Sequence, residues 1–316
     1  MDLSVIIPFK NEEGNLEKLN KELALVLFKI GKKCEVIYVD DGSDDKSSDV
    51  IRKSINNISY KNISFKLISL RKNFGQTSAI AAGIDNSAGK HISFLDADLQ
   101  NDPNDIPRFL DKLKEGYDAV FGWRKIRRDA SLRSYLSKTA NTIINKLFQY
   151  PYHDVGCSAR VVKREFLLDL GLFGELHRVM PVLIHLKGAK ISEIVVSHRE
   201  RTEGKSKYGF ERIVKTIIDM ITVKFLTSYG TKPAYVFGTA GLGSIGISGL
   251  TILAVAYRKL FQGVYVHRDP LFLIAIFFGL LGVQFMLMGL LAELQIRTYF
   301  GSQKKPIYEI KSIEKY

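Results

Sequence analysis

The sequence predicts a doubly wound α/β domain, built on a mostly parallel sheet, followed by a pair of membrane-spanning helices. Three observations support this prediction. Short apolar runs alternate with helical patterns through the first part of the chain. Two long segments near the C-terminus contain no charged residue. The mean hydropathy of zero therefore averages two unlike parts, and it excludes both an ordinary soluble enzyme and a disordered chain, which would have low hydrophobicity.

The apolar runs of the first part are interpreted as strands, and the amphipathic segments between them as helices. Strands are expected at residues 3–9, 35–39, 65–69, 91–95 and 119–121, and helices at 16–30, 47–55, 75–87 and 106–114. Such alternation is typical of a parallel sheet covered by helices on both faces. Ligands of these sheets bind at the carboxyl ends of the strands. The polar residues that follow each strand are therefore the candidates for a site.

Two segments near the C-terminus are long enough to cross a bilayer. Residues 233–257 and 270–292 form charge-free stretches of 25 and 23 residues, whereas a spanning helix needs about 20. The alternative, a buried core helix, is rarely this long. The short connection predicts an antiparallel hairpin. Ala240, Ser244 and Ser248 recur every four residues and offer a helix-packing face, which leaves homo-oligomer formation open.

The distribution of lysine and arginine predicts the topology and the domain boundaries. These residues are more frequent before the first span and after the second than in the loop between the spans, so both termini are expected in the cytoplasm. Residues 1–209 form the soluble domain, and 233–316 the hairpin with a cytosolic tail. Residues 210–232 show apolar side chains at helical spacing, which indicates an amphipathic helix on the membrane or, alternatively, a helix packed on the soluble domain. No signal peptide is expected, because the chain opens directly into the first strand.

Positive charge is concentrated in the second half of the soluble domain. Residues 1–122 carry 17 basic and 19 acidic side chains, whereas residues 123–230 carry 20 and 10. An anionic partner is expected there: nucleic acid, a phosphorylated substrate or an anionic membrane surface. Stacking aromatic residues do not alternate with these charges, which argues against nucleic acid. The two cysteines, Cys34 and Cys157, are too far apart in sequence to indicate a disulfide framework.

The most informative motif is a pair of aspartates after the fourth strand. The sequence has neither a Gly-x-Gly-x-x-Gly after its first strand nor a phosphate-binding P-loop motif. Asp96 and Asp98 instead stand one residue apart where an apolar strand ends. Two neighbouring carboxylates suit a hard divalent ion such as Mg²⁺, which takes oxygen ligands and is often shared with substrate phosphates. The alternative is that the aspartates cap the following turn.

Several motifs together carry a resemblance to a known family. These are Val5-Ile-Ile-Pro-Phe-Lys-Asn-Glu-Glu13, Val39-Asp-Asp-Gly-Ser43, Arg71-Lys-Asn-Phe-Gly-Gln76, Leu95-Asp-Ala-Asp-Leu-Gln100, Asp154-Val-Gly-Cys-Ser-Ala-Arg160 and the segments 199–208 and 289–297. In order and spacing they resemble the family 2 glycosyltransferases with the Rossmann-like GT-A fold. The closest likeness is to the polyprenyl-phosphate glycosyltransferases, which include dolichyl-phosphate mannose synthase and bacterial undecaprenyl-phosphate glucosyltransferases. The chain departs from the family at Phe9-Lys10 and at Ala292-Glu-Leu294.

The resemblance implies a role for individual residues. The nucleotide would contact Pro8, Phe9, Glu12, Asp40 and Asp41, and the segment containing Arg71, Asn73, Gly75 and Gln76 would border the same pocket. Asp96 and Asp98, with Ala97 between them and Gln100 nearby, would hold Mg²⁺ or Mn²⁺ against the diphosphate of the donor. The phosphate ligands would be Arg124, Arg128, Arg201 and Lys207, although each could instead belong to a solvated or lipid-facing basic surface. His153 and His177 are interpreted as structural.

The implied reaction is a single inverting displacement in which a polyprenyl phosphate attacks a nucleotide-sugar. The acceptor phosphate has a second pKa near 6, so a strong general base is not required. Asp154 is expected to orient the acceptor or take a proton, or else to be structural. UDP-glucose is the first choice of donor; GDP-mannose, UDP-GlcNAc and an aminoarabinose donor remain open. The enzyme is expected in the inner (plasma) membrane with its catalytic domain in the cytoplasm, and a downstream flippase is a candidate partner. Rival readings are a processive polysaccharide synthase, a nucleotidyltransferase and a non-enzymatic membrane scaffold.

Overall fold

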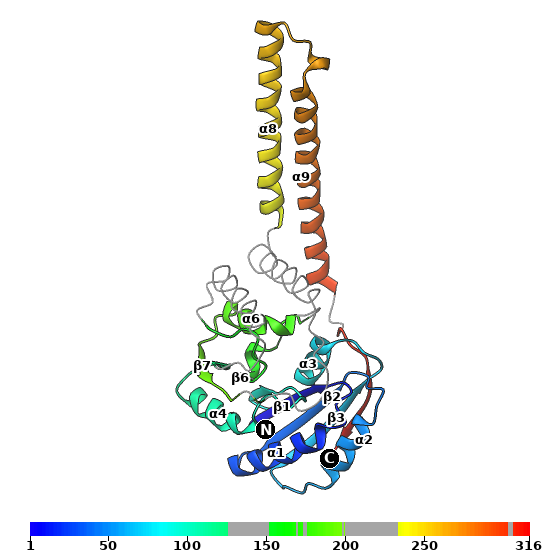
Figure 1. Ribbon diagram of the computed structural model, residues 1–316, viewed down its shortest axis with the longest axis vertical. Helices are drawn as coiled ribbons and strands as arrows, with labels where there is room; N and C mark the ends of the chain where they lie inside the picture. Colours follow the sequence, from blue (N-terminus) through cyan, green and yellow to red (C-terminus); the bar gives the residue numbers. More distant parts are fainter. Residues whose placement is uncertain (126–151, 169, 173–175, 198, 200–232, 303–305) are drawn as a thin grey trace. The chain divides into compact units, whose positions relative to one another are not determined.

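The computed structural model describes residues 1–125, 152–168, 170–172, 176–197, 199, 233–302 and 306–316. The chain divides into two compact units (Figure 1). One comprises Met1–Met220 together with Pro306–Tyr316, and the other comprises Ile221–Lys305. The sequence-based division placed the C-terminal tail with the hairpin, whereas its contacts place it in the first unit. The helix expected at 210–232 lies outside the described residues.

The first unit is built on an eight-stranded sheet of order β7-β5-β6-β4-β1-β2-β3-β8. Strands β1 to β4 run parallel to one another, as do β5 and β7, whereas β6 and β8 are antiparallel to their neighbours. The mostly parallel α/β fold predicted from the sequence is thereby confirmed. The strands are β1 Leu3–Phe9, β2 Cys34–Asp40, β3 Ile63–Leu70, β4 His91–Phe94, β5 Ala119–Trp123, β6 Arg160–Lys163, β7 Ile191–Val195 and β8 Ile310–Lys315.

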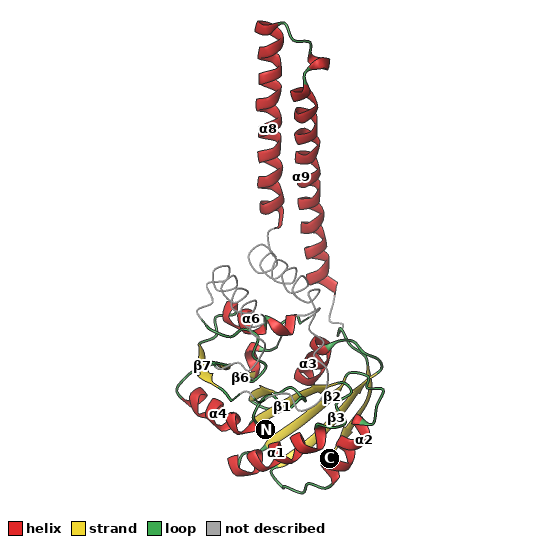
Figure 2. Cartoon of the chain, in the orientation of Figure 1, coloured by secondary structure: helices red, strands yellow, loops and turns green. Residues whose placement is uncertain are grey.

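Helices cover both faces of this sheet (Figure 2). Helices α1, α2 and α4 lie on one side, and α3 and α6 on the other. The four helices expected from the sequence are present, whereas α6 and the strands β6, β7 and β8 were not anticipated. The helices are α1 Leu16–Ile30, α2 Ser47–Asn56, α3 Gln76–Asp85, α4 Ile106–Lys114 and α6 Met180–Leu186, with short 3₁₀ turns η1 Pro103–Asp105, η2 Arg164–Phe166 and η3 Leu176–Arg178.

The core forms because the central strands are apolar on both faces. All seven residues of β1 and of β2 are buried, as expected for parallel strands between two helical layers. Val5, Ile7 and Phe9 alternate onto the side covered by α1. On the other side α3 approaches so closely that a Cβ atom at Gly83 would overlap the Ile6 side chain. The central strands are therefore fixed rigidly, and so are the residues at their ends.

The second unit contains two long helices, α8 Pro233–Gln262 and α9 Pro270–Ser302, connected by a short segment that includes the 3₁₀ turn η4 Val266–Arg268. The stretches Phe237–Gln262 and Pro270–Ala292 are long and apolar enough to cross a membrane, with mean hydropathies of 1.7 and 2.5. Large apolar side chains on both helices are exposed, including Leu250 and Leu273 at 70% and 71%. So much exposed apolar surface favours a lipid environment.

Small residues pack the two helices of this hairpin against each other. A Cβ atom at Gly282 would lie 2.8 Å from the carbonyl oxygen of Gly241. The Ser248 hydroxyl donates a 2.7 Å hydrogen bond to the Ala275 carbonyl. Ser244 and Ser248 are buried, whereas Ala240 is exposed. The small-residue face predicted from the sequence is therefore used mainly within the hairpin.

Candidate active site

The carboxyl ends of β1, β2 and β4 meet at one edge of the sheet. The parallel register places Phe9 opposite Asp40 and Ile6 opposite Phe94. One further hydrogen bond, from Leu95 N–H to the Ile6 carbonyl at 3.2 Å, continues the pairing beyond β4. The aspartates that follow β2 and β4 therefore lie along the same edge, where α/β sheets bind their ligands. We call this the site edge.

Asp40 and Asp41 are held by neutral donors. The Oδ1 atom of Asp40 accepts from Ser43 N–H at 2.8 Å, and its other oxygen accepts from the Ser48 hydroxyl. Asp41 accepts from the backbone N–H groups of Phe74 and Gly75 at 2.7 and 3.0 Å. Burial raises the pKa of Asp41, although these two hydrogen bonds and the nearby Lys10 charge act against the shift. Both side chains thus have fixed orientations.

Asp41 attaches the turn after β2 to the segment that follows β3. A Cβ atom at Gly42, whose φ is +69°, would lie 2.7 Å from the carbonyl carbon of Lys72. Only glycine permits so close an approach in that backbone conformation. We define residues 71–76 as the donor loop. It ends at Gln76, the first residue of α3, whose side-chain amide donates to Asp96 Oδ1 at 3.1 Å.

A strained backbone conformation directly follows the Asp-Ala-Asp turn. Among the described residues, the non-glycine residues with positive φ are Leu99, at 61°, and Asn11, at 56°. Both follow strands that end at the site edge. The left-handed region costs a residue such as leucine on the order of 1 kcal/mol, and burial of the Leu99 side chain in the core offsets this cost. The turn aims Asp98 by anchoring the residue after it.

The donor set at this turn fits a hard divalent ion. No group of three or more His, Cys, Asp or Glu side chains in the described part of the chain is arranged to hold a metal. Two neighbouring carboxylates suit Mg²⁺ or Mn²⁺ when the remaining ligands come from substrate phosphates and water. Asp96 is half-exposed and Asp98 is buried, with Gln100 N–H donating to Asp98 Oδ1 at 3.2 Å. A metal-ligand role for the Gln100 side chain stays a prediction.

Asp154 forms an ion pair with Arg124. Its two oxygens accept from Nε and Nη2 of Arg124 at 2.8 and 3.0 Å, and Oδ2 also accepts from the Arg124 backbone N–H at 3.2 Å. The Asp154 carboxylate is only 2% exposed. Bidentate pairs of this kind fix orientation strongly. The geometry therefore favours an orienting role for Asp154, and proton transfer by it stays a prediction.

The remaining predicted residues occupy three kinds of environment. Pro8, Phe9 and Ala97 are buried, and the Phe9 ring packs edge-on against Tyr38, with ring centroids 6.5 Å apart. Glu12 accepts from the Asn15 side chain at 2.7 Å. Arg71 and Asn73 are exposed on the donor loop. Arg128, Arg201 and Lys207 lie outside the described residues.

Comparison with known proteins agrees with this arrangement. The glycosyl transferase family 2 model matches residues 4–171. A Rhizobium johnstonii protein named dodecaprenyl-phosphate galacturonate synthase is 33% identical over 317 residues, which cover 99% of this chain and 93% of the relative. The chain belongs to glycosyl transferase family 2.

A second relative supports this assignment, and a solved structure shares the fold. A Shewanella sediminis protein named undecaprenyl-phosphate 4-deoxy-4-formamido-L-arabinose transferase is 33% identical to this family 2 glycosyltransferase, covering 98% of the chain and 92% of the relative. Glucosyl-3-phosphoglycerate synthase from Mycobacterium tuberculosis, in complex with Mn²⁺, UDP and glucosyl-3-phosphoglycerate, superimposes with a TM-score of 0.55 at 16% identity. That match covers 71% of this chain and 79% of the other. The shared fold is GT-A.

Sequence reasoning missed several residues of this glycosyltransferase that hold the site edge in place. Ser48 contacts Asp40 from the first turn of α2. Glu309 accepts a 3.0 Å hydrogen bond through its carbonyl from Arg71 N–H. Arg199 pairs with Glu22 at 2.7 Å and with Asp102 at 2.8 Å. A serine near a helix start is a weak signal, because the same pattern caps helices.

Proposed function

We propose that the protein transfers a sugar from a nucleotide-sugar to a polyprenyl phosphate and releases a nucleoside diphosphate. The observation that carries the proposal is the site edge, where Asp40 and Asp41 at the end of β2 and the paired carboxylates Asp96 and Asp98 after β4 lie on either side of β1. The names of the two relatives, both polyprenyl-phosphate sugar enzymes, support the choice of acceptor.

Each part of the site edge has a role in this proposal. Asp40, Asp41 and Glu12 accept hydrogen bonds from the base and ribose, and the backbone at Pro8 and Phe9 borders the base. Asp96 and Asp98 hold Mg²⁺ or Mn²⁺, which when bound stabilises the charge of the departing diphosphate. Gln76 keeps Asp96 oriented through its 3.1 Å hydrogen bond. Because the Gln76 amide is uncharged, the negative charge of the Asp96 carboxylate remains available to the cation.

The acceptor side of the site uses the basic part of the chain. Arg124, fixed by Asp154, and the predicted ligands Arg128, Arg201 and Lys207 bind phosphate, which suits the guanidinium group in particular. The acceptor phosphate is a competent nucleophile near neutral pH because its second pKa is about 6. Its oxygen attacks the anomeric carbon in line with the leaving diphosphate, so the configuration inverts.

The reaction takes place at a membrane in this proposal. The α8–α9 hairpin anchors the chain in the inner (plasma) membrane with both termini in the cytoplasm, where nucleotide-sugars are made. A homo-oligomer and a downstream flippase are the protein partners we would test first. UDP-glucose is our first choice of donor, and the relatives' names add galacturonate and formamido-arabinose donors to the candidates.

A donor panel assay tests the proposal. Membranes containing the protein are incubated with undecaprenyl or dodecaprenyl phosphate, Mn²⁺ and one radiolabelled nucleotide-sugar at a time. The panel includes UDP-glucose, GDP-mannose, UDP-GlcNAc and nucleotide-activated galacturonate, aminoarabinose and formamido-arabinose. We expect an organic-soluble glycolipid with one donor, and its loss with EDTA. Membranes that make no metal-dependent glycolipid across the panel would favour the non-enzymatic scaffold instead.

A further inference from the structure

The segment that follows α9 belongs to the first unit and extends its sheet beyond β3. Strand β8 pairs antiparallel with β3, with Ile313 opposite Ile68. Phe65 and Tyr316 exchange two backbone hydrogen bonds of 3.0 and 2.9 Å. An open β3 would present unpaired backbone groups to other chains. Pairing with β3 explains why a strand forms there, but not why its side chains contact the helices around the site edge.

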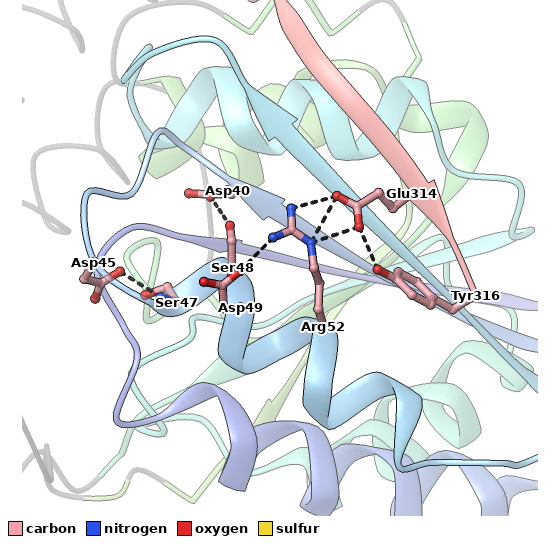
Figure 3. Close-up of polar contacts among 8 residues, drawn as sticks. All are labelled: Asp40, Asp45, Ser47, Ser48, Asp49, Arg52, Glu314 and Tyr316. Carbon is pink, nitrogen blue, oxygen red and sulfur yellow. Dashed lines mark hydrogen bonds and ion pairs between the residues drawn. The ribbon is translucent and has the colours of Figure 1, made fainter.

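One line of contacts runs from β8 to the first turn of α2 (Figure 3). The Glu314 carboxylate accepts from Nη2 and Nε of Arg52 at 2.8 and 2.9 Å, and from the Tyr316 hydroxyl at 2.7 Å. Hydrogen bonds from Arg52 first and Tyr316 second lower the pKa of Glu314. Arg52 also donates to Asp49 at 3.0 Å. The bidentate pair therefore holds α2 against β8 with a defined geometry.

Helix α2 carries this contact to Asp40. Ser48 stands four residues before Arg52 in α2, so the two side chains project from the same face of the helix, one turn apart. The Ser48 hydroxyl donates to Asp40 at the end of β2. A shift of α2 along β8 would move this hydroxyl away from the carboxylate. Glu314 and Asp40 are thus connected through one helical turn.

A second line of contacts runs from the same segment to the donor loop. The Glu309 carbonyl accepts from Arg71 N–H, where the loop begins, and the two side chains approach to 3.7 Å. The Tyr308 hydroxyl donates to Asp85 at 2.7 Å. Asp85 is the last residue of α3, the helix that starts at the end of the donor loop. The segment therefore contacts the loop at its start and the following helix at its far end.

We propose that residues 306–316 are a positioning element of the donor site. Arg52, Glu314 and Ser48 are positioning residues that set the orientation of Asp40, and Glu309 and Tyr308 set the position of the donor loop. This inference rests on the proposed function, in which Asp40 and the donor loop bind the nucleotide. Nucleotide affinity then depends on a segment that follows the second long helix in the chain.

Nucleotide binding by the full-length protein tests this inference. The dissociation constants of UDP and GDP, each with Mn²⁺, are measured by calorimetry in detergent for the wild type, Glu314→Gln, Arg52→Gln and Ser48→Ala. We expect each substitution to weaken the preferred nucleotide about three- to tenfold. Donor KM should rise by the same factor while kcat at saturating donor is kept. Binding of Glu314→Gln at the wild-type affinity would overturn the proposal.

A matched ion pair at the edge of the sheet opposite the site edge serves as a control for effects that arise only from lost stability. Lys163 and Asp118 lie 2.6 Å apart, with side-chain exposures of 36% and 20%, close to the 36% and 31% of Arg52 and Glu314. Asp118→Asn should lower the melting temperature about as much as Glu314→Gln and leave nucleotide affinity unchanged. If Asp118→Asn weakens nucleotide binding equally, the effect of Glu314 is one of general stability and the proposal fails.

The double variant Glu314→Gln/Ser48→Ala tests whether the contacts act in one line. If both residues act through α2, the double variant binds nucleotide no more weakly than Ser48→Ala alone. If they act independently, the two fold-changes in nucleotide affinity multiply. Multiplied effects would overturn the route through α2. A wild-type protein that binds neither UDP nor GDP would overturn the proposed function itself, and this inference with it. If the wild type and Glu314→Gln bind the nucleotide with equal affinity, only this inference is overturned and the proposed function stands.

Discussion

Carboxylates stand at both edges of the sheet, but different groups hold them. At the edge where β2 and β5 begin, Glu35 pairs with Lys66 at 2.8 Å and Asp118 with Lys163 at 2.6 Å. We call this the far edge. At the site edge, the contacts of Asp40, Asp41 and Asp96 come from serine, backbone N–H groups and the Gln76 amide. Within the described residues, none of these three aspartates forms an ion pair.

In our proposal, this difference separates carboxylates that stabilise the fold from carboxylates that bind the cation and the nucleotide. An ammonium partner at 2.6–2.8 Å neutralises the charge at the far edge and makes those residues part of the folded framework. Hydroxyl and amide donors fix the orientation of a carboxylate while leaving its net charge in place. A cation and the hydrogen-bond donors of a nucleotide can then use that charge. The Arg124–Asp154 pair departs from this pattern, and there the arginine faces anionic substrates in our proposal.

Replacement of Asp98 gives the largest expected effect. Asp98→Asn keeps the shape of the side chain and removes the charge that holds the metal in our proposal, so kcat should fall by about a thousandfold or more. The melting temperature should stay near that of the wild type. Glycolipid formation at saturating donor and Mn²⁺, measured beside thermal unfolding, checks both. A fully active Asp98→Asn enzyme would remove the metal assignment and the distinction between the two edges.

Replacement of Glu35 should give the opposite result. Glu35 is buried and accepts from Ser4, Lys66 and the Ala88 N–H. Glu35→Gln leaves the Lys66 charge without its partner, which should cost about 2–4 kcal/mol of unfolding free energy, while kcat of the folded enzyme is kept. Thermal or denaturant unfolding measures the loss. The double variant Glu35→Gln/Lys66→Met should recover part of it, and a stable but inactive Glu35→Gln would contradict the comparison.

Acidification should destabilise the protein through its far edge. Burial is the largest single influence on Glu35 and Asp118 and opposes ionisation, but the hydrogen bonds to each carboxylate together lower both pKa values. A lowered pKa stabilises the folded state above the unfolded values of about 4, and this stability is lost as the pH falls through the folded values. Burial also lowers the pKa of His91. The stability that neutral His91 contributes to the folded state is therefore lost as the pH falls below about 6.5.

The raised pKa of Asp41 acts with the opposite sign, because its protonated form is favoured in the folded state. The far-edge groups outnumber it, so the net effect remains a loss of stability. A melting temperature followed from pH 7 to pH 3 should therefore decrease, and Glu35→Gln should show a smaller decrease than the wild type. Equal decreases in the wild type and in Glu35→Gln would mean that the Glu35 carboxylate contributes no pH-dependent stability.

The sequence predicts the central fold well because its strands are buried on both faces. The expected strand 3–9 and helices 16–30 and 106–114 coincide with β1, α1 and α4. Strand β8 could not be predicted in this way, because every second residue from Lys311 to Lys315 is exposed and its neighbours are half-buried. It is held mainly by backbone pairing with β3, for which a local sequence pattern gives no signal. Edge strands such as β7 are hard to predict for the same reason.

The site was predictable to the level of strand ends and no further. Parallel strands place Asp40 and Asp96 at one edge whatever the loops do, so the spacing was sufficient. Phe9 was expected to contact the nucleotide, which stays a prediction for its backbone, because side-chain alternation along β1 turns the ring into the core with Val5 and Ile7. The contacts of Gln76 and Ser48 depend on loop conformations between residues far apart in the sequence. A motif identifies such residues without giving their partners.

Replacement of Gln76 gives the smallest expected effect. It is also the sharpest test of whether uncharged donors orient the carboxylates at the site edge. Gln76→Leu removes the amide that donates to Asp96 at 3.1 Å on an exposed surface, where such a bond contributes about 1 kcal/mol. The Mn²⁺ concentration at half-maximal rate should rise about fivefold, with kcat at saturating Mn²⁺ unchanged, and calorimetry of Mn²⁺ in the presence of UDP should show the same factor. Asn104→Ala, which removes an exposed 2.8 Å amide bond to Asp102, should leave both values unchanged. A lower kcat at saturating Mn²⁺ would instead mean that Gln76 contacts the substrate itself.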